Sequence, residues 1–284
     1  MLWPEAPQFD VEKVVEACRA WLTSEGTYET VRTRLRELKA GEKAYRAAGE
    51  KGELLQHLLH YGQRQRNDRH AELLKNTYTT AFVQRAEGRK LYDAIKASAI
   101  HGSCPLCGLQ QVAQLDHHAP KANFPLLALT PLNLVPACGP CNLGKSNKLA
   151  TLVTEEAFHP YFEDLGSDRW LHAQIDAAER VVIFEARPPT GWDEVKRRRI
   201  IHHFESHDLA FRYGEAAGSA VAKRRHRDAD LLAETESAAE VRAHIRADAV
   251  SHAAYDPNSF ETALLYALVE SAWYLNGGME LLYA

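Results

Sequence analysis

Residues 104–148 read CPLCGLQQVAQLDHHAPKANFPLLALTPLNLVPACGPCNLGKSNK and contain two Cys-x-x-Cys pairs, Cys104/Cys107 and Cys138/Cys141. Each pair turns the backbone tightly enough for both sulfurs to face one point, so four thiolates can surround one zinc ion. A site with four thiolate ligands leaves no open position for water or substrate. We therefore expect a structural zinc here, and we look for reactive side chains between and just after the two pairs.

Three short motifs within this stretch resemble the HNH nuclease family, whose fold is called ββα-metal. They are LDHHAP at 115–120, NLVP at 133–136 and CGPCNLGK at 138–145, in the order of the family pattern. The resemblance covers less than a fifth of the chain. Asn142 stands where many members carry a third histidine, and this difference bears on the preferred metal more than on the activity.

The same residues fit the chemistry of phosphodiester cleavage, which needs a base to activate water and a cation to neutralise phosphate charge. His117 suits the base, because an unperturbed histidine has a pKa of about 6.5. Asp116 and the Asn142 carbonyl are hard oxygen ligands, which favour Mg²⁺ or Mn²⁺. The resemblance implies that Asn133 holds the loop carrying His117 through hydrogen bonds from its side chain to the backbone. It also implies products with 5′-phosphate and 3′-hydroxyl ends.

The adjacency of Asp116 and His117 restricts the local structure. Neighbouring residues of a strand point to opposite faces, so these two can share a site only at a bend or a strand end. Pro120, three residues later, fits such an end. By the same alternation His118 should face away from His117, and we expect it to pack or to hydrogen-bond.

The composition is that of a globular protein without a bilayer-spanning segment. The 284 residues are 45% hydrophobic and 25% charged, no apolar run is long enough to cross a bilayer, and the first residues do not form a signal peptide. Four of the five cysteines lie in the two pairs, which indicates a metal in a reducing compartment. We therefore expect a cytoplasmic protein, with Cys18 as a small core residue.

The regions on either side of the zinc stretch read as mostly helical. We expect a helical region over 1–98, a module of the ββα-metal type over 99–165, and a region over 166–284 that begins with a hairpin and continues with helices. The fold class is thus α+β, predominantly α-helical, with an embedded zinc module. Apolar spacing predicts helices over 11–22, 28–48 and 71–98, with Asp10 as a cap, Gly49 and Gly52 as an end and Gly88 as an interruption. The segment 54–67 should begin as a helix and then become a basic, polar surface connection.

In the third region we expect strands over 170–175 and 180–186, lying on helices or extending the first sheet, and then helices over 192–207, 209–233, 238–254 and 260–275. The aromatic run FHPYF at 158–162 should anchor the module to its surroundings. A similar His-Pro-Tyr-Phe follows the domain in the HNH proteins that this chain resembles, many of them in antiphage defence.

Contacts to nucleic acid must come from local basic patches, since the net charge of the chain is −4. We select Lys145, one helical turn after Asn142, and Arg197 with Arg199 in the basic run 196–199. The run 223–227 and the arginines at 64–69 are alternatives. Each of these could equally be a solvated helix face.

The sequence thus predicts an HNH endonuclease with a structural Zn²⁺ and a catalytic Mg²⁺ or Mn²⁺, acting on nucleic acid, and on DNA in preference. An antiphage role with a partner ATPase follows only from the resemblance. Two alternatives stay open: an RNase of the same fold, and a non-catalytic zinc-ribbon adaptor that binds nucleic acid or protein.

Overall fold

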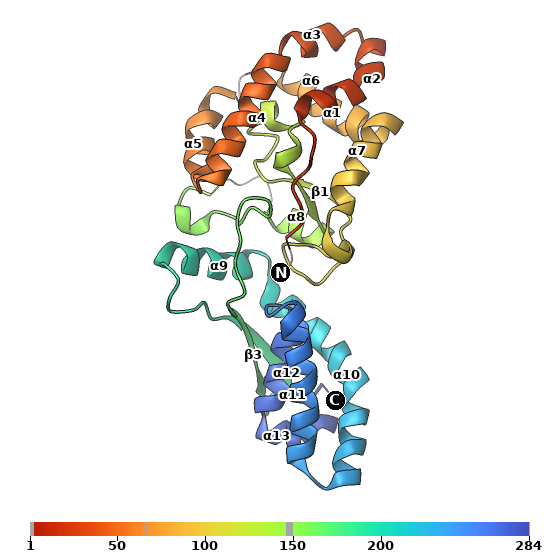
Figure 1. The fold of residues 1–284 in the computed structure, drawn as a ribbon, viewed down its shortest axis with the longest axis vertical. Coiled ribbons are helices and arrows are strands. Elements are labelled where there is room, and N and C mark those ends of the chain that lie inside the picture. Colours follow the sequence, from red (N-terminus) through yellow and green to blue (C-terminus); the bar gives the residue numbers. More distant parts are fainter. Residues whose placement is uncertain (1–2, 66–67, 146–149, 284) are drawn as a thin grey trace. The chain divides into compact units, whose positions relative to one another are not determined.

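The computed structural model describes residues 3–65, 68–145 and 150–283, with the side chains of 62–65 and of residue 145 also outside the description. The chain is mostly helical and carries two separate two-stranded sheets (Figure 1). It divides into two compact units. One comprises residues up to 106 with 110–164, and the other comprises residues 165–284 with 107–109. No helix in the described part is long and apolar enough to span a membrane.

The first unit is built from short helices around a small sheet. Its elements in order are α1 (Val11–Ala17), α2 (Arg19–Ser24), α3 (Tyr28–Thr33), α4 (Leu35–Glu50), α5 (Leu54–Gln65), α6 (Ala71–Asn76), the π-helix η1 (Thr77–Phe82), α7 (Ala86–Ala97), η2 (Ile100–Gly102), β1 (Gln114–His117), η3 (Pro125–Leu127), η4 (Pro131–Asn133), β2 (Leu134–Ala137), α8 (Gly139–Lys145) and η5 (Val153–Glu155). The predicted strand–strand–helix order of the module is therefore present as β1, β2 and α8.

The first predicted helix begins as expected but breaks in two. The Asp10 carboxylate accepts a hydrogen bond from the Lys13 amide and caps α1. Cys18 lies between α1 and α2, and it is 1% exposed. Burial raises the pKa of its thiol to about 12, so this cysteine is a core residue and not a reactive thiol.

Two glycines have packing roles that the sequence did not predict. Gly49 is the last residue but one of α4, which ends at Glu50 as predicted, and a side chain at Gly49 would collide with the Phe162 ring, which packs against the bare backbone. Gly88 lies inside α7, where its missing side chain lets α7 approach the Ala81 carbonyl. The predicted interruption of the 71–98 helix instead occurs at Arg85, which has an extended backbone.

The sheet of the module is antiparallel and very small. Its register pairs Gln114 with Ala137 at one end and His117 with Leu134 at the other. Two short strands are marginal on their own. Here Leu115 and Leu134 belong to the same buried cluster as Val14, Phe82 and many other side chains of the preceding helices. The N-terminal helices therefore supply the hydrophobic core that the module lacks, and both lie in one compact unit.

The second unit contains β3 (Leu171–Asp176), β4 (Val181–Ala186), α9 (Glu194–Ser206), α10 (Leu209–Thr235), α11 (Ala238–Tyr255), α12 (Phe260–Glu270), α13 (Ala272–Leu275) and η6 (Gly278–Glu280). The predicted hairpin is confirmed: β3 and β4 form an antiparallel pair that packs on α10 and α12 and is separate from the first sheet. The predicted 260–275 helix is divided at Ser271, whose hydroxyl accepts a hydrogen bond from the Tyr274 amide and caps α13.

Candidate functional site

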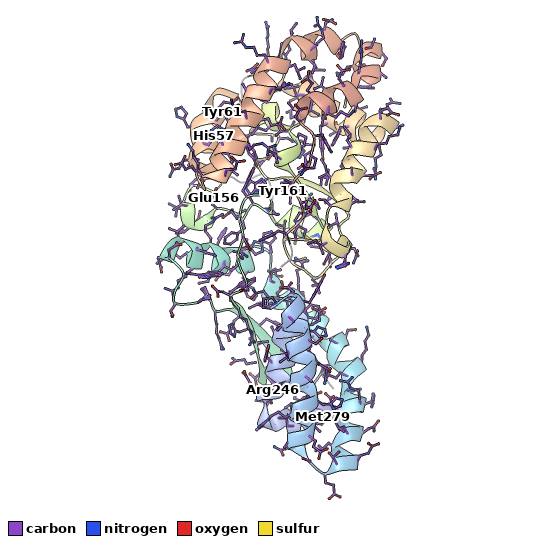
Figure 2. All side chains as sticks on the ribbon, in the orientation of Figure 1. His57, Tyr61, Glu156, Tyr161, Arg246 and Met279 are labelled. Atoms are coloured by element: carbon purple, nitrogen blue, oxygen red, sulfur yellow. The ribbon has the colours of Figure 1, made fainter. Side chains whose placement is uncertain are left out.

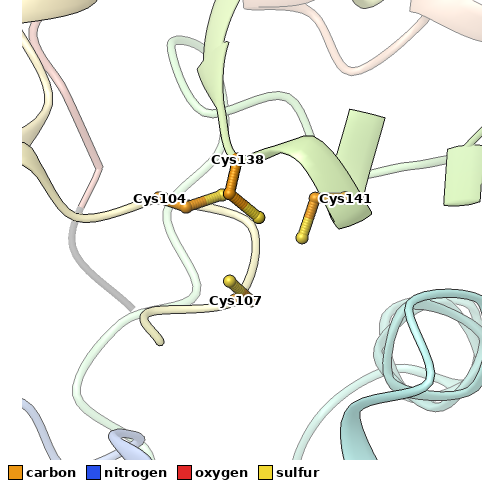
Figure 3. Close-up of side chains that lie close together, drawn as sticks. All are labelled: Cys104, Cys107, Cys138 and Cys141. Atoms are coloured by element: carbon orange, nitrogen blue, oxygen red, sulfur yellow. The ribbon is translucent and has the colours of Figure 1, made fainter. Parts of the chain in front are cut away.

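The four cysteines of the two Cys-x-x-Cys pairs lie close together in space. All four are buried, and their sulfurs lie within 4.8 Å of one another. Figure 3 shows the side chains converging from the loop before β1, from the end of β2 and from the start of α8. None of the chain's five cysteines forms a disulfide.

This geometry fits a zinc ion. Zinc binds thiolates at about 2.3 Å in tetrahedral sites, which places the sulfurs about 3.8 Å apart. The observed cluster is within reach of that spacing, and its burial excludes a fifth ligand from solvent. These four residues could therefore hold a structural metal ion such as zinc, as predicted from their spacing. The ligand chemistry leaves this site without a catalytic position.

A separate pocket of about 630 Å³ lies beside the sheet of the module, within the first unit. Its lining includes side chains from β1, from the loop after it, from α8 and from the N-terminal helices. The polar or charged ones include Thr79, Gln114, Asp116, His117, Lys121 and Asn142. The structure thus brings together three of the four side chains predicted to act in catalysis.

His117 is the last residue of β1 and is 8% exposed. Its Nε2 lies 3.0 Å from the carbonyl oxygen of Ala128. A carbonyl only accepts hydrogen bonds, so Nε2 carries the proton in the neutral ring and Nδ1 is the nitrogen with basic character. The Tyr78 ring packs against the imidazole edge to face, with centroids 4.4 Å apart and planes 65° apart. Both contacts fix the orientation of the ring.

Asp116 and His117 line the same pocket although they are neighbours in a strand. The strand ends at His117, so the alternation of side chains does not continue beyond it. Asp116 is partly exposed, in contrast to the buried Leu115 on one side and His117 on the other. The strand therefore ends at His117, before Pro120, as the sequence predicted.

Asn142 reaches the pocket from the first turn of α8. Its backbone N–H donates to the Cys138 carbonyl at 3.1 Å, in the first turn of a helix that begins between the two cysteines of the second pair. The cysteine pair therefore fixes both the metal cluster and the position of Asn142. A carboxylate and a carboxamide oxygen, from Asp116 and Asn142, both line the pocket.

Asn133 does not line the pocket but makes the hydrogen bonds predicted for it. It is fully buried, and its side-chain nitrogen donates to the carbonyl oxygens of Ala119 at 3.0 Å and of Leu127 at 3.1 Å. Its side-chain oxygen accepts from the Ala119 amide at 2.6 Å and from the Tyr45 hydroxyl at 3.1 Å. One amide group therefore fastens both ends of the loop that follows His117 and attaches this loop to α4.

His118 does not belong to the pocket lining, as the alternation indicated. Its ring packs on His159, with centroids 4.3 Å apart. His159 Nε2 lies 3.1 Å from the Tyr45 hydroxyl. Tyr161, which is labelled in Figure 2, donates from its hydroxyl to the Leu134 carbonyl at 2.8 Å. The 158–162 run therefore packs against α4 and β2 and supports the site without entering it.

The predicted substrate-binding residues lie in different parts of the molecule. The side chain of Lys145 is outside the described residues. Arg197 and Arg199 lie on α9, in the unit that begins at residue 165, whereas the pocket belongs to the other unit. Arg197 lies 3.3 Å from a Glu194 carboxylate oxygen, and both arginines are only partly exposed. Trp192, the first residue of the predicted 192–207 helix, precedes α9 and is only partly buried.

Two arginines of the alternative basic run at 223–227 pair with carboxylates of their own unit. Arg224 contacts Asp228 at 2.7 Å and Asp248 at 2.8 Å, with only 13% of its side chain exposed. Arg227 also reaches Asp248, at 2.7 Å. Asp228 in turn accepts from the Tyr274 hydroxyl. Arg224 and Arg227 thus belong to an ion-pair network between α10 and α11, to which Tyr274 of α13 is hydrogen-bonded.

Two residues of the pocket that contact or neighbour the predicted base, Lys121 and Tyr78, were not selected from the sequence. Lys121 directly follows Pro120, the last residue of the 115–120 motif, and this position could have indicated that it lies near the site. Tyr78 lies far upstream of the motif, in the π-helix η1. Nothing in the sequence indicates that this residue meets His117, because only the packing of η1 beside β1 brings them together.

Comparisons with known proteins give one relative. The chain is 31% identical over 135 residues to "Protein ea31" of Escherichia phage lambda. The match covers 46% of this chain and 45% of that protein, so the chain spans less than half of the relative's length. No family profile matches the chain. No solved structure matches it significantly.

Proposed function

We propose that this protein is a metal-dependent endonuclease of the HNH type that hydrolyses phosphodiester bonds of nucleic acid, with DNA as the favoured substrate. The observation that carries the proposal is the pocket in which Asp116, His117 and Asn142 meet. A structural zinc ribbon needs only the four cysteines, and it has no use for a histidine oriented by a carbonyl beside two oxygen ligands.

The imidazole of His117 is the base in this proposal. With the Nε2 proton held on the Ala128 carbonyl, Nδ1 accepts a proton from a water molecule. The hydrogen bond also stabilises the imidazolium that forms, because the carbonyl remains an acceptor for the Nε2 proton. Tyr78 restricts rotation of the ring. Asn133 acts one step away, by fixing the loop that carries the Ala128 carbonyl.

The residues present fit a divalent cation with hard ligands. Asp116 and Asn142 would hold it through a carboxylate and a carboxamide oxygen, a set that suits Mg²⁺ or Mn²⁺. When bound, the ion supplies positive charge for the phosphate and for the leaving 3′-oxygen. The protein contributes the position of these ligands at the end of β1 and the start of α8.

Two alternative functions remain compatible with the same structure. An RNase would use the same pocket on a different substrate, and an adaptor would use the cysteine cluster alone. The proposal of a role in antiphage defence with a partner ATPase rests on the resemblance to HNH proteins of such systems. The matched relative is itself a phage protein, and its name assigns no activity.

One assay separates these readings. Purified protein is incubated with supercoiled plasmid or with transfer RNA, in buffers with Mg²⁺, Mn²⁺ or EDTA. We expect cleavage of plasmid with either metal and none with EDTA. Selective cleavage of transfer RNA would support the RNase, and no cleavage of either substrate would support the adaptor.

Matched variants connect the activity to the pocket. Asn142→Ala should raise the Mg²⁺ concentration needed for half-maximal cleavage or nearly abolish turnover, because one oxygen ligand is lost. The control is Asn276→Ala, an exposed asparagine of the second unit whose side chain donates only to Ala272. Equal metal requirements for both variants would remove Asn142 from the proposed cation site.

A further inference from the structure

Lys121 is the only positively charged residue among the described residues that line the pocket. Three basic side chains of the helices before the module pair with carboxylates: Lys75 with Glu72, Lys90 with Glu87 and Arg89 with Asp93. No carboxylate of the described residues forms an ion pair with Lys121. The chain therefore keeps an uncompensated positive charge beside Asp116 and His117, in a pocket that accepts a ligand of substantial size.

The ammonium of Lys121 is held by an aromatic ring instead. Its Nζ lies 4.6 Å from the centroid of the Tyr78 ring, within the range of a cation–π contact. The same ring packs against His117. Tyr78 is 5% exposed, so its orientation is set by the core beneath it. One buried ring thus contacts both the proposed base and the only described cation of the pocket.

The backbone that presents Tyr78 is a π-helix, η1, inserted between α6 and the residues before α7. Its widened turns leave carbonyls that side chains can satisfy: the Thr77 hydroxyl donates to the Leu73 carbonyl at 2.7 Å, and the Thr79 hydroxyl donates to the Lys75 carbonyl at 3.1 Å. Such π-turns are rare and often occur at functional sites. The N-terminal helices therefore form one wall of the pocket.

We propose that Lys121 binds a phosphate of the nucleic acid in the pocket and that Tyr78 is a positioning residue for both Lys121 and His117. The inference rests on the proposed function and extends it to substrate contact. Burial, followed by the nearby charge of Lys75, lowers the pKa of Lys121. An anion in the pocket would oppose this shift, since a nearby negative charge stabilises the ammonium form.

The first experiment measures binding apart from cleavage. In a His117→Ala background with Ca²⁺, the affinity for a 20-base-pair DNA duplex is followed by fluorescence anisotropy over a range of salt concentrations. Lys121→Met keeps the length of the side chain and removes its charge. We expect affinity to fall about tenfold, and the slope of log affinity against log salt to flatten by roughly 0.9, the value for one phosphate contact.

Two variants control this measurement. Lys121→Arg keeps the charge and should keep the slope. Lys90→Met removes a lysine of the same unit that lies outside the pocket lining and pairs with Glu87, and it should change neither affinity nor slope. Thermal melting of each variant verifies the fold. A slope that is unchanged in well-folded Lys121→Met protein, or one that flattens equally in Lys90→Met protein, would overturn the phosphate contact.

The role of Tyr78 is tested through activity. Tyr78→Leu loses the ring and should lower kcat by about tenfold or more as well as raise KM, because both the base and the cation lose their support. Tyr78→Phe keeps the ring and should recover most of both losses. An equal fall in kcat for the two variants would contradict a positioning role for the ring. A higher KM with unchanged kcat would contradict it as well.

The two proposals fail in distinguishable ways. If neither duplex DNA nor transfer RNA is bound or cleaved by the wild-type protein, the nuclease proposal and the Lys121 contact both fail. If the protein cleaves and His117→Ala is inactive, but Lys121→Met matches the wild type in slope and in kcat/KM, only the Lys121 contact fails.

Discussion

The cysteine cluster and the candidate functional groups of the pocket beside β1 lie in the same 45-residue stretch, yet they differ in the kinds of side chain and in exposure to solvent. The cluster consists of four buried ligands of one kind. The pocket is open to solvent and gathers a carboxylate, a carboxamide, an imidazole and an ammonium. A closed set of equal ligands stabilises a fold, whereas an open set of unlike groups can bind substrate and move protons. One region is thus suited to structure and the other to reaction.

The largest expected effect concerns the cluster. Cys141→Ser should release the metal and unfold the module, because structural zinc sites contribute about 10–16 kcal/mol of apparent binding free energy to folding at neutral pH. Elemental analysis and thermal melting measure both consequences. Cys18→Ser is the control: it changes a buried cysteine outside the cluster and should leave one zinc per chain. Well-folded wild-type protein without zinc would show that the cysteine cluster is not a structural zinc site.

The second effect is confined to the pocket. His117→Ala should lower the rate of cleavage by about 10²- to 10⁴-fold, the usual contribution of a general base, with zinc content unchanged. Because His117 is buried and hydrogen-bonded to the Ala128 carbonyl, this variant should also lose about 1–3 kcal/mol of stability.

Cleavage rates of His117→Ala are therefore measured well below its melting temperature. His118→Ala is the matched control, since that ring packs on His159 outside the pocket lining. If His118→Ala abolishes cleavage and His117→Ala does not, the assignment of the base is wrong.

The third effect should appear both in the stability of the protein and in its cleavage rate. Asn133→Ala removes the partner of two carbonyls, an amide and a hydroxyl, all buried. We expect a loss of about 3 kcal/mol or more in urea unfolding, since each unsatisfied buried group costs about 1–3 kcal/mol and the structure relaxes in part. Cleavage should fall as well, because the loop after His117 loses its attachment. A variant that loses activity with unchanged stability would show that Asn133 contacts substrate instead.

The smallest effect lies outside both regions. Arg34 donates to both carboxylate oxygens of Asp68 and holds the pKa of that carboxyl below its usual value. Asp68→Asn should lower stability at pH 7 by about 1 kcal/mol, the upper end for a partly exposed pair. The folded-state pKa is the lower one. The contribution is therefore complete above the unfolded pKa of about 3.9 and disappears as the pH falls through the folded value.

Urea unfolding at several pH values measures this difference. The curves of Asp68→Asn and wild type should differ at neutral pH and converge in acid, while zinc content and cleavage rate stay the same. A stability difference that persists in acid, or a change in cleavage, would show that this ion pair is coupled to the site.

Local sequence determined much of this protein. The spacing of the cysteines determined that four sulfurs could meet, and Asp10 and the apolar repeat of 11–22 indicated the first helix. The strand end at His117 followed from two adjacent polar residues before a proline, and the hairpin over β3 and β4 from short β-prone runs. In each case the signal lies within a few residues of the structure that it specifies, so the chain carries it wherever it folds.

Only the tertiary structure decided the rest. Gly49 and Gly88 read as helix breakers, yet each is a place where another part of the unit packs against bare backbone. The run at 223–227 reads as an open basic patch, but Asp248 from α11 and Asp228 neutralise Arg224. Tyr78 meets His117 and Lys121 because η1 packs beside β1. These contacts join residues far apart in sequence, so they depend on how helices share a core, which no local pattern records.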